Sequence, residues 1–304
     1  MEAKHSKFCH LCGKKLLGTY FTYNDTLVVC SECNATTPRC GKCDIPSLQL
    51  TLVRGVLICP ACRKKLPICP CCHIPILGKY FIIGDSPLPY CEACVNTRPR
   101  CDICRVPLDE KGKVFPRQGG NINRCATCLA SSVMLTADAE LYYRSTNALM
   151  KDELQLDIPV LPKLYLAERA DLVKLNRQAG ILEDPNVPLG PEHQHILGFF
   201  QRINEERNIY IERLLPQTLF RAVAAHELAH AWQSFYAPPT QPLMIVEGFA
   251  EWVAYSVLLA RGQQREAARL TRRTAGDIYG DGLQYFIKLE REQGRQAVLQ
   301  RART

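Results

Sequence analysis

The spacing of the cysteines constrains this chain most. All seventeen lie before residue 129 of the 304, and sixteen of them form eight C-x-x-C pairs. The intervals between successive pairs alternate between fifteen to twenty residues and a constant six. Two pairs flanking one long interval supply four sulfur ligands, which suits a tetrahedral zinc ion at about 2.3 Å. The pattern predicts four closed sites: Cys9, Cys12, Cys30 and Cys33; Cys40, Cys43, Cys59 and Cys62; Cys69, Cys72, Cys91 and Cys94; Cys101, Cys104, Cys125 and Cys128.

A second period of about 60 residues overlies this spacing. Residues 8–12 and 17–21 are echoed at 68–72 and 77–81, and the Pro-Arg-Cys run ending at Cys40 returns at Cys101. Each long interval carries short apolar runs broken by turn residues, which is typical of a small β-hairpin. We therefore predict two double-finger modules, residues 1–66 and 67–132, followed by a third domain at 133–304.

One other pairing of the same cysteines is possible. A cross-braced RING arrangement would join pairs across the six-residue intervals instead of the long ones. Cys71 is left over by both schemes, and we expect a half-buried free thiol there. His10 and His73 are each adjacent to a ligand cysteine, and we expect surface or supporting positions for both.

Composition narrows the setting of the protein. No signal-peptide-like apolar core opens the chain, and we expect no later run to reach the roughly 18 apolar residues of a membrane-spanning helix. We therefore expect a cytoplasmic protein without a membrane partner, whose thiols stay reduced and available to metal. The formal charge of +8 falls to about zero once sixteen thiolates hold four zinc ions, so nucleic acid is not an expected partner.

The cysteine-free half has an α+β pattern. Asp138 is a candidate helix cap, with Leu141, Ala148 and Leu149 on the apolar face of that helix. A strand is expected at 163–168 and a short helix from Asp171. Extended runs at 196–203 and 208–214 predict an antiparallel hairpin, whose second strand leads into the next helix and offers a place for an extended peptide to pair.

The sequence His226-Glu227-Leu228-Ala229-His230 lies in a predicted helix at 217–235. Histidines four residues apart share one helix face, so both rings can reach one metal ion beside Glu227. A second helix, at about 243–260, carries Glu247 and Glu251 one turn apart. Two imidazoles and one carboxylate leave the fourth position of a zinc ion open, as in a catalytic site. The residues alone leave open which glutamate is the third ligand.

Three resemblances follow from these motifs. The fingers resemble tandem LIM domains, although Cys30 and Cys91 stand where LIM fingers usually have histidine and the six-residue spacer is usually two. The HELAHAW run with the Glu-Gly-Phe-Ala-Glu run resembles gluzincin peptidases, which implies that Glu247 is the third ligand. Together with Tyr279-Gly280-Asp281-Gly282, the chain resembles the DA-one family of LIM-containing, ubiquitin-activated peptidases. No ubiquitin-interacting helix is recognisable, so we expect a shorter, bacterial relative.

The sequence therefore predicts four structural zinc ions and one catalytic zinc ion. The expected fold class is α+β: an N-terminal array of four LIM-like zinc fingers, each with four cysteine ligands, followed by a mostly helical gluzincin-type domain with a small antiparallel sheet. Glu227 is the expected general base. Tyr279 leads His193 and His195 as the donor to a developing oxyanion.

Two functions are consistent with this pattern. The first is a zinc-dependent protein endopeptidase whose finger array binds protein substrates, or a partner such as ubiquitin, or regulates the cleft. The second is a zinc-finger adaptor with an inactive peptidase-like domain.

Overall fold

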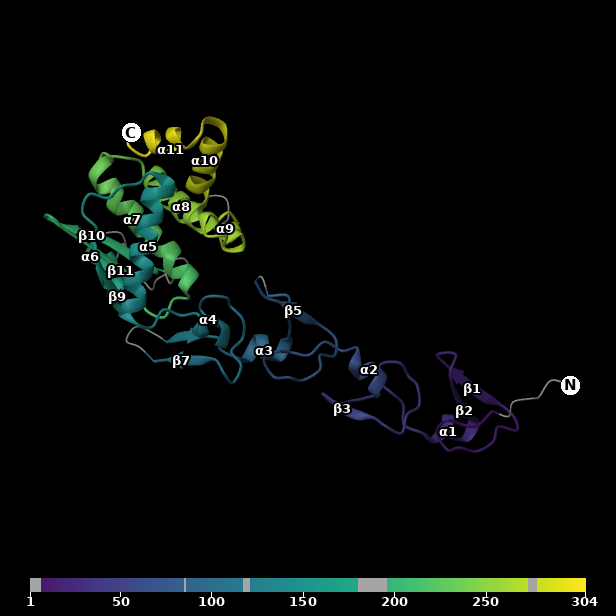
Figure 1. Ribbon diagram of the computed structural model, residues 1–304. Helices are drawn as coiled ribbons and strands as arrows, with labels where there is room; N and C mark the ends of the chain where they lie inside the picture. The colour runs from purple at the N-terminus through teal and green to yellow at the C-terminus, as the bar shows by residue number, and fades with distance from the viewer. Residues whose placement is uncertain (1–6, 85, 117–120, 180–195, 273–277) are drawn as a thin grey trace. The chain divides into compact units, whose positions relative to one another are not determined.

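The computed structural model describes residues 7–84, 86–116, 121–179, 196–272 and 278–304 (Figure 1). The chain divides into two compact units, Met1–Gly112 and Lys113–Thr304, called unit 1 and unit 2 below. The domain boundaries expected at 66/67 and 132/133 stay predictions. The architecture is mixed α and β, with small hairpins in the cysteine-rich part, as predicted.

Unit 1 repeats one short motif, a two-stranded antiparallel hairpin followed by a single helical turn or two. The elements are β1 (Tyr20–Tyr23), β2 (Leu27–Cys30) and α1 (Ser31–Thr36); β3 (Thr51–Val53), β4 (Val56–Ile58) and α2 (Pro60–Lys64); and β5 (Tyr80–Ile82), β6 (Pro89–Cys91) and α3 (Glu92–Thr97). The first hairpin turns at Asn24 and Asp25, which have φ of 49° and 58°. Asn and Asp tolerate this left-handed region better than most residues, so the turn chemistry supports the predicted hairpin.

The short helices of unit 1 begin at cysteines. The sulfurs of Cys30 and Cys59 accept hydrogen bonds from the backbone N–H of Cys33 and Cys62, in the cap position of α1 and α2. Helices of five or six residues are too short to persist by propensity alone. The sulfur that would bind metal therefore also fixes the start of α1 and α2, whereas Cys91 at the start of α3 makes no such bond.

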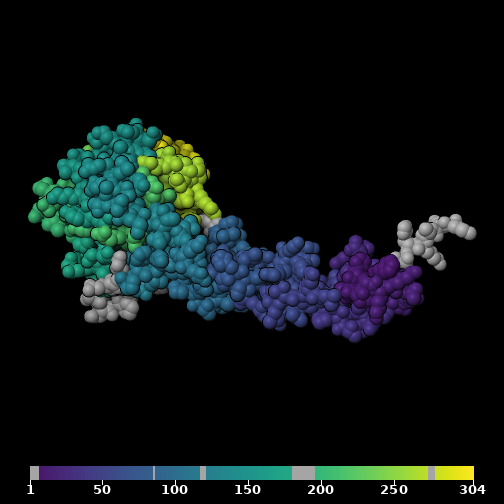
Figure 2. Space-filling model, turned by 60° about the horizontal axis from the view of Figure 1, so that its bottom comes forward, coloured from purple at the N-terminus to yellow at the C-terminus, as the bar shows by residue number. Residues whose placement is uncertain are grey.

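Unit 2 contains one three-stranded sheet, a hairpin and a group of helices, and its atoms, teal to yellow in Figure 2, form a continuous rounded body. Its elements are β7 (Lys113–Phe115), β8 (Ile122–Arg124), α4 (Ala126–Ala130), α5 (Thr136–Leu154), β9 (Lys163–Ala167), α6 (Arg169–Gln178), β10 (Gly198–Ile203), β11 (Glu206–Glu212), α7 (Gln217–Tyr236), α8 (Leu243–Ala260), α9 (Gln264–Leu270), α10 (Ile278–Gln293) and α11 (Arg295–Arg301). The helices expected at 217–235 and 243–260, and the strand expected at 163–168, are confirmed within one residue at each end.

The three-stranded sheet of unit 2 is mixed, which corrects the expected antiparallel sheet. Its order is β10-β11-β9; β10 pairs with β11 antiparallel, as predicted, but β11 pairs with β9 in parallel. A parallel pair needs a long crossover connection, and α6 lies in the segment between these strands. A pattern of apolar residues does not encode strand direction, so the sequence missed this.

Two details of α5 were predicted wrongly. Its N-cap is Leu135, and Asp138 lies inside the first turn. Leu141 is 62% exposed, whereas Tyr143 and Met150 are buried. The Tyr143 hydroxyl donates to the carbonyl of Pro162 at 3.0 Å. The helix thus turns the face with Tyr143 and Met150 inward, which the apolar spacing did not reveal.

The core of unit 2 centres on aromatic rings from α7, α8 and α10. Phe249 packs against Trp232, Trp252 and Phe286, with ring centroids 5.3 to 5.8 Å apart. By length and composition, α8 meets the criteria for a membrane-spanning helix, contrary to the expectation from sequence, and 61% of that window is buried inside the protein. The core helix of a folded domain meets the same criteria, and α8 supplies much of this core.

Candidate metal centre

The sixteen paired cysteines come together as four groups. Their membership is the predicted one, and the sulfurs of each group lie within 4.8 Å of one another. The Sγ–Sγ separations of Cys12–Cys30, Cys43–Cys59 and Cys72–Cys91 are each 3.9 Å. Sulfurs at about 2.3 Å in a tetrahedron are about 3.8 Å apart, whereas a disulfide needs about 2.05 Å. The donor sets fit structural zinc, and the cross-braced pairing is contradicted.

The remaining cysteine stands outside these groups. Cys71 is buried, its thiol donates to the carbonyl of Leu108 at 3.2 Å, and burial raises its pKa. This is a satisfied neutral thiol, buried rather than half-buried as expected. His10 is exposed and its Nδ1 lies 3.0 Å from the backbone nitrogen of Val28. Neither His10 nor His73 belongs to a metal-binding group among the described residues.

A fifth group lies on α7 and α8 and consists of His226, His230 and Glu247. The two Nε2 atoms are 3.1 Å apart, and Glu247 Oε2 lies 3.3 Å from Nε2 of His226 and 3.5 Å from Nε2 of His230. Nitrogen and oxygen ligands at about 2.0–2.1 Å in a tetrahedron are about 3.3 Å apart. The three donor atoms therefore form one face of a tetrahedron of the size that zinc requires.

Glu251 occupies a different position from Glu247. Its Oε1 lies 3.3 Å from Nδ1 of His226, on the opposite edge of the ring from the Nε2 that faces Glu247. A carboxylate on the outer nitrogen orients a ligating histidine and makes it a better donor. The geometry thus favours Glu247 as a ligand and Glu251 as its support.

Gln233 is a supporting residue that the sequence did not reveal. It is buried, its Oε1 lies 2.9 Å from Nδ1 of His230, and its Nε2 donates to the carbonyl of Val246 at 3.0 Å. With the histidine donating from Nδ1, Nε2 is left as the metal-facing lone pair. Gln233 also joins α7 to α8 directly before Glu247. Its position one turn after His230 is the sequence feature from which this supporting role could have been predicted.

The charges around this group favour a cation. Burial lowers the pKa of His226, but hydrogen bonds to Glu247 and Glu251 outweigh it, and the pKa lies well above its usual range. Burial raises the pKa of Glu247, but the charge of His230 and contacts with both histidines hold it well below its usual range. Two carboxylates thus face the histidines, and their negative charge favours a cation between the donor atoms.

Glu227 lies beside the donor triangle and is only 7% exposed. Burial raises its pKa against the lowering charges of His226 and His230. A Cβ built on Gly198 of β10 would come within 2.5 Å of Glu227 Oε1. Only glycine lets the strand approach the carboxylate this closely, so the sheet closes over Glu227 and limits its contact with water.

Tyr279 lies near the same group because two helices cross at glycines. A Cβ on Gly248 of α8 would lie 2.5 Å from the Cα of Gly282 in α10, so the two backbones touch there. Tyr279, one turn before Gly282, thereby comes to His226 with ring centroids 6.4 Å apart. The other two candidate donors, His193 and His195, lie outside the described residues.

The hairpin beside α7 has one correction. The sequence pointed to its second strand as the place for a peptide to pair, but β11 is the central strand and pairs on both sides. Within the described residues β10 pairs with β11 alone, so its outer edge has no strand partner, and the backbone of Phe200 in β10 hydrogen-bonds Glu227. β10 is also the strand that carries Gly198 against Glu227.

No protein-family model matches the chain, and no curated protein matches it.

Proposed function

We propose that the chain is a zinc-dependent protein endopeptidase. The observation that carries this proposal is the triangle of donor atoms from His226, His230 and Glu247, with the buried carboxylate of Glu227 beside it. A structural zinc site closes all four positions with protein ligands, whereas three ligands leave one open. The resemblance of the sequence to gluzincin and DA-one peptidases points to the same chemistry.

The residues then have distinct roles. Bound zinc supplies Lewis acidity, which polarises a carbonyl and acidifies water. Glu227 takes the proton from the attacking water and later delivers it to the leaving amine, from its buried position beside the donor triangle. Glu251 and Gln233 hold the two histidine rings. Tyr279 donates to the developing oxyanion.

The substrate binds as an extended segment along the outer edge of β10. Backbone N–H and C=O groups there can pair with any peptide sequence, and the face of β10 at Gly198 packs directly on Glu227. The finger array recruits the protein substrate or regulates access to the site. Ubiquitin is a candidate partner of the array because of the DA-one resemblance.

The test is a Glu227→Gln variant assayed on unfolded protein substrates, with metal content measured in parallel. Loss of a general base should lower the rate about 10²–10⁴-fold, while the fifth zinc ion stays bound. Glu205→Gln, an exposed carboxylate in the β10–β11 turn, is the matched control and should retain full activity. A wild-type protein that binds the fifth zinc ion but cleaves nothing would instead support the adaptor function.

A further inference from the structure

The fourth cysteine group departs from the repeat at one buried position. The residue before the third cysteine of each group is buried. In the first three groups it is uncharged: Val29, Ile58 and Tyr90. In the fourth group it is Arg124, on β8, with 0% of its surface exposed. A buried arginine where the repeat carries an uncharged side chain needs a partner that offsets its desolvation.

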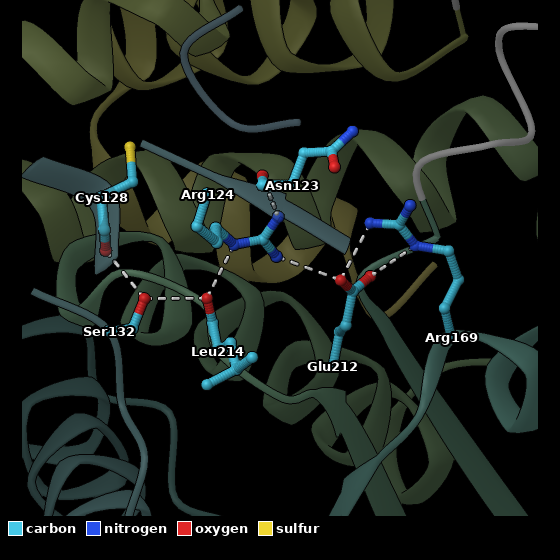
Figure 3. Close-up of polar contacts among 7 residues, drawn as sticks. All are labelled: Asn123, Arg124, Cys128, Ser132, Arg169, Glu212 and Leu214. Atoms are coloured by element: carbon cyan, nitrogen blue, oxygen red, sulfur yellow. Dashed lines mark hydrogen bonds and ion pairs between the residues drawn. The ribbon is translucent and has the colours of Figure 1, made fainter. Parts of the chain in front are cut away.

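That partner is the end of strand β11. Arg124 donates from Nε to the carbonyl of Leu214 at 2.9 Å and from a terminal nitrogen to Glu212 Oε1 at 3.2 Å (Figure 3). Glu212 is 1% exposed. Arg169, at the start of α6, donates to both oxygens of the same carboxylate from its other side. Two guanidinium groups thus hold one buried carboxylate, and the three residues form a charge-assisted network.

The segment after the cysteines is tied to the same place. The Ser132 hydroxyl donates to the carbonyls of Cys128 and Leu214 (Figure 3). The backbone nitrogen of Gln217, the first residue of α7, donates to Ser131 O at 2.7 Å. Leu214 has a φ of 59°, which is rare and strained for a branched side chain. Two donors on its carbonyl hold it in that conformation.

These contacts lie on the chain segments that adjoin the metal centre. Residues 213–216 alone separate β11 from α7, the helix that carries His226, Glu227 and His230. On the strand side, the backbone nitrogen of Glu212 donates to Leu197 O at 2.8 Å, next to the glycine of β10 that packs on Glu227. The network therefore fixes both elements that bracket Glu227, the start of its helix and the strand above it.

We propose that Arg124 is a positioning residue of the metal centre on α7, so that β8 and α4 are working parts of the fold that carries this centre. The inference rests on the proposed function only in calling that centre catalytic. It also assigns the last cysteine pair, Cys125 and Cys128, a role other than recognition, because the residues on either side of this pair hold the junction of β11 and α7.

The test replaces Arg124 by the residue that the repeat itself carries in the second group. In full-length Arg124→Ile we expect amide hydrogen exchange across residues 213–220 to accelerate at least tenfold. Affinity of the His226 centre for cobalt(II), followed by its visible spectrum, should fall at least tenfold. Arg124→Lys keeps the positive charge but lacks the planar guanidinium that reaches two acceptors. It should therefore restore part of the slow exchange and part of the cobalt affinity. Tyr90→Ile, the same position in the third group, is the matched control and should change neither.

A second variant separates positioning from the cost of a stranded charge. In Arg124→Ile/Glu212→Gln no buried carboxylate loses its partner, and the amide oxygen at position 212 can still accept from Arg169, so the protein should fold with a near-normal melting temperature. Exchange at 213–220 should nevertheless remain fast, because Leu214 has lost a donor. If amide hydrogens at 213–220 exchanged at the wild-type rate in this double variant, or in folded Arg124→Ile, the proposal would be overturned. Because exchange does not depend on turnover, this outcome is readable even if the wild-type protein cleaves nothing.

Discussion

Unit 1 and unit 2 are each stabilised internally by different interactions. An apolar cluster in unit 1 is built around cysteines, namely Cys40 and Cys59 with Val53, Ile58 and Leu66, and the strands of this unit are three or four residues long. Unit 2 buries two tryptophans and several large aromatic side chains among helices of up to twenty residues. Metal ligands therefore take the place of a core in unit 1. Unit 2 shares the fourth cysteine group through Cys125 and Cys128, but its helices have an aromatic core, and the His226 centre is built on that core without supporting the fold.

Chelation should break this comparison most clearly. Structural zinc contributes on the order of 10–16 kcal/mol to small finger peptides, which matches the stability of a whole domain. With a strong chelator, residues 7–112 and the segment around Cys125 and Cys128 should lose protection from proteolysis, while helices α5 to α11 of unit 2 remain protected and the circular dichroism keeps its helical signal. The comparison would be wrong if unit 1 stayed protected after its zinc had been removed and measured.

A glycine substitution in unit 2 tests how much its stability depends on close packing of the core helices. An added Cβ at Gly282 would meet the backbone of α8 at 2.5 Å, so Gly282→Ala must push two core helices apart. We expect a loss of about 3 kcal/mol, which lowers the melting temperature of unit 2 by about 6–12 °C.

The matched control lies in unit 1. A Cβ at Gly18 would meet nothing within 4 Å, so Gly18→Ala should leave both units unchanged. If Gly282→Ala and Gly18→Ala destabilised the protein equally, the close crossing of α8 and α10 would not contribute the stability that we expect from it. An unchanged rate of proteolysis by folded Gly282→Ala would likewise show that the crossing does not position Tyr279 for that centre.

The two units also differ in how far the sequence predicts them. The cysteine spacing was sufficient to predict the four groups, because C-x-x-C pairs at alternating intervals have few ways to satisfy a tetrahedral ion. Likewise, the spacing of His226 and His230 on a helix predicted which side chains would meet. Both are short-range patterns in which local geometry determines the contact.

What the sequence did not predict depends on contacts between distant elements. The parallel pairing of β9 with β11 has no local signature, nor does the inward face of α5. Glu247 and Glu251 were indistinguishable by spacing, and only the ring edge that each one faces separates their roles. Arg124 resembled any charged residue of a hairpin until the fold placed Glu212 beside it.

A support of the metal centre offers the next prediction. Gln233→Leu keeps the approximate size of the side chain but removes the acceptor on Nδ1 of His230 and the link to Val246. Loss of such an outer partner typically costs 10–100-fold in metal affinity. We expect this loss at the fifth site alone, measured by zinc titration, with the sixteen cysteine sulfurs still loaded. Gln284→Leu, at an exposed position on α10, is the control, and equal affinities in the two variants would contradict the role of Gln233.

The smallest expected effect tests whether unit 1 has any analogue of such support. Arg54, in the turn between β3 and β4, donates to Cys91 Sγ at 3.0 Å and approaches Cys72 Sγ at 3.9 Å. A guanidinium beside thiolates stabilises their charge, but Arg54 is exposed and solvent screens the interaction. Arg54→Met should therefore speed zinc release from the third group only a few-fold, measured by transfer to a coloured chelator. Arg63→Met, also at an exposed position, should leave zinc release unchanged.

If Arg54→Met instead weakened zinc binding by the third group as much as Gln233→Leu weakens binding at the fifth site, the fingers would also depend on contacts outside their own ligands. The contrast between the two units would then be smaller.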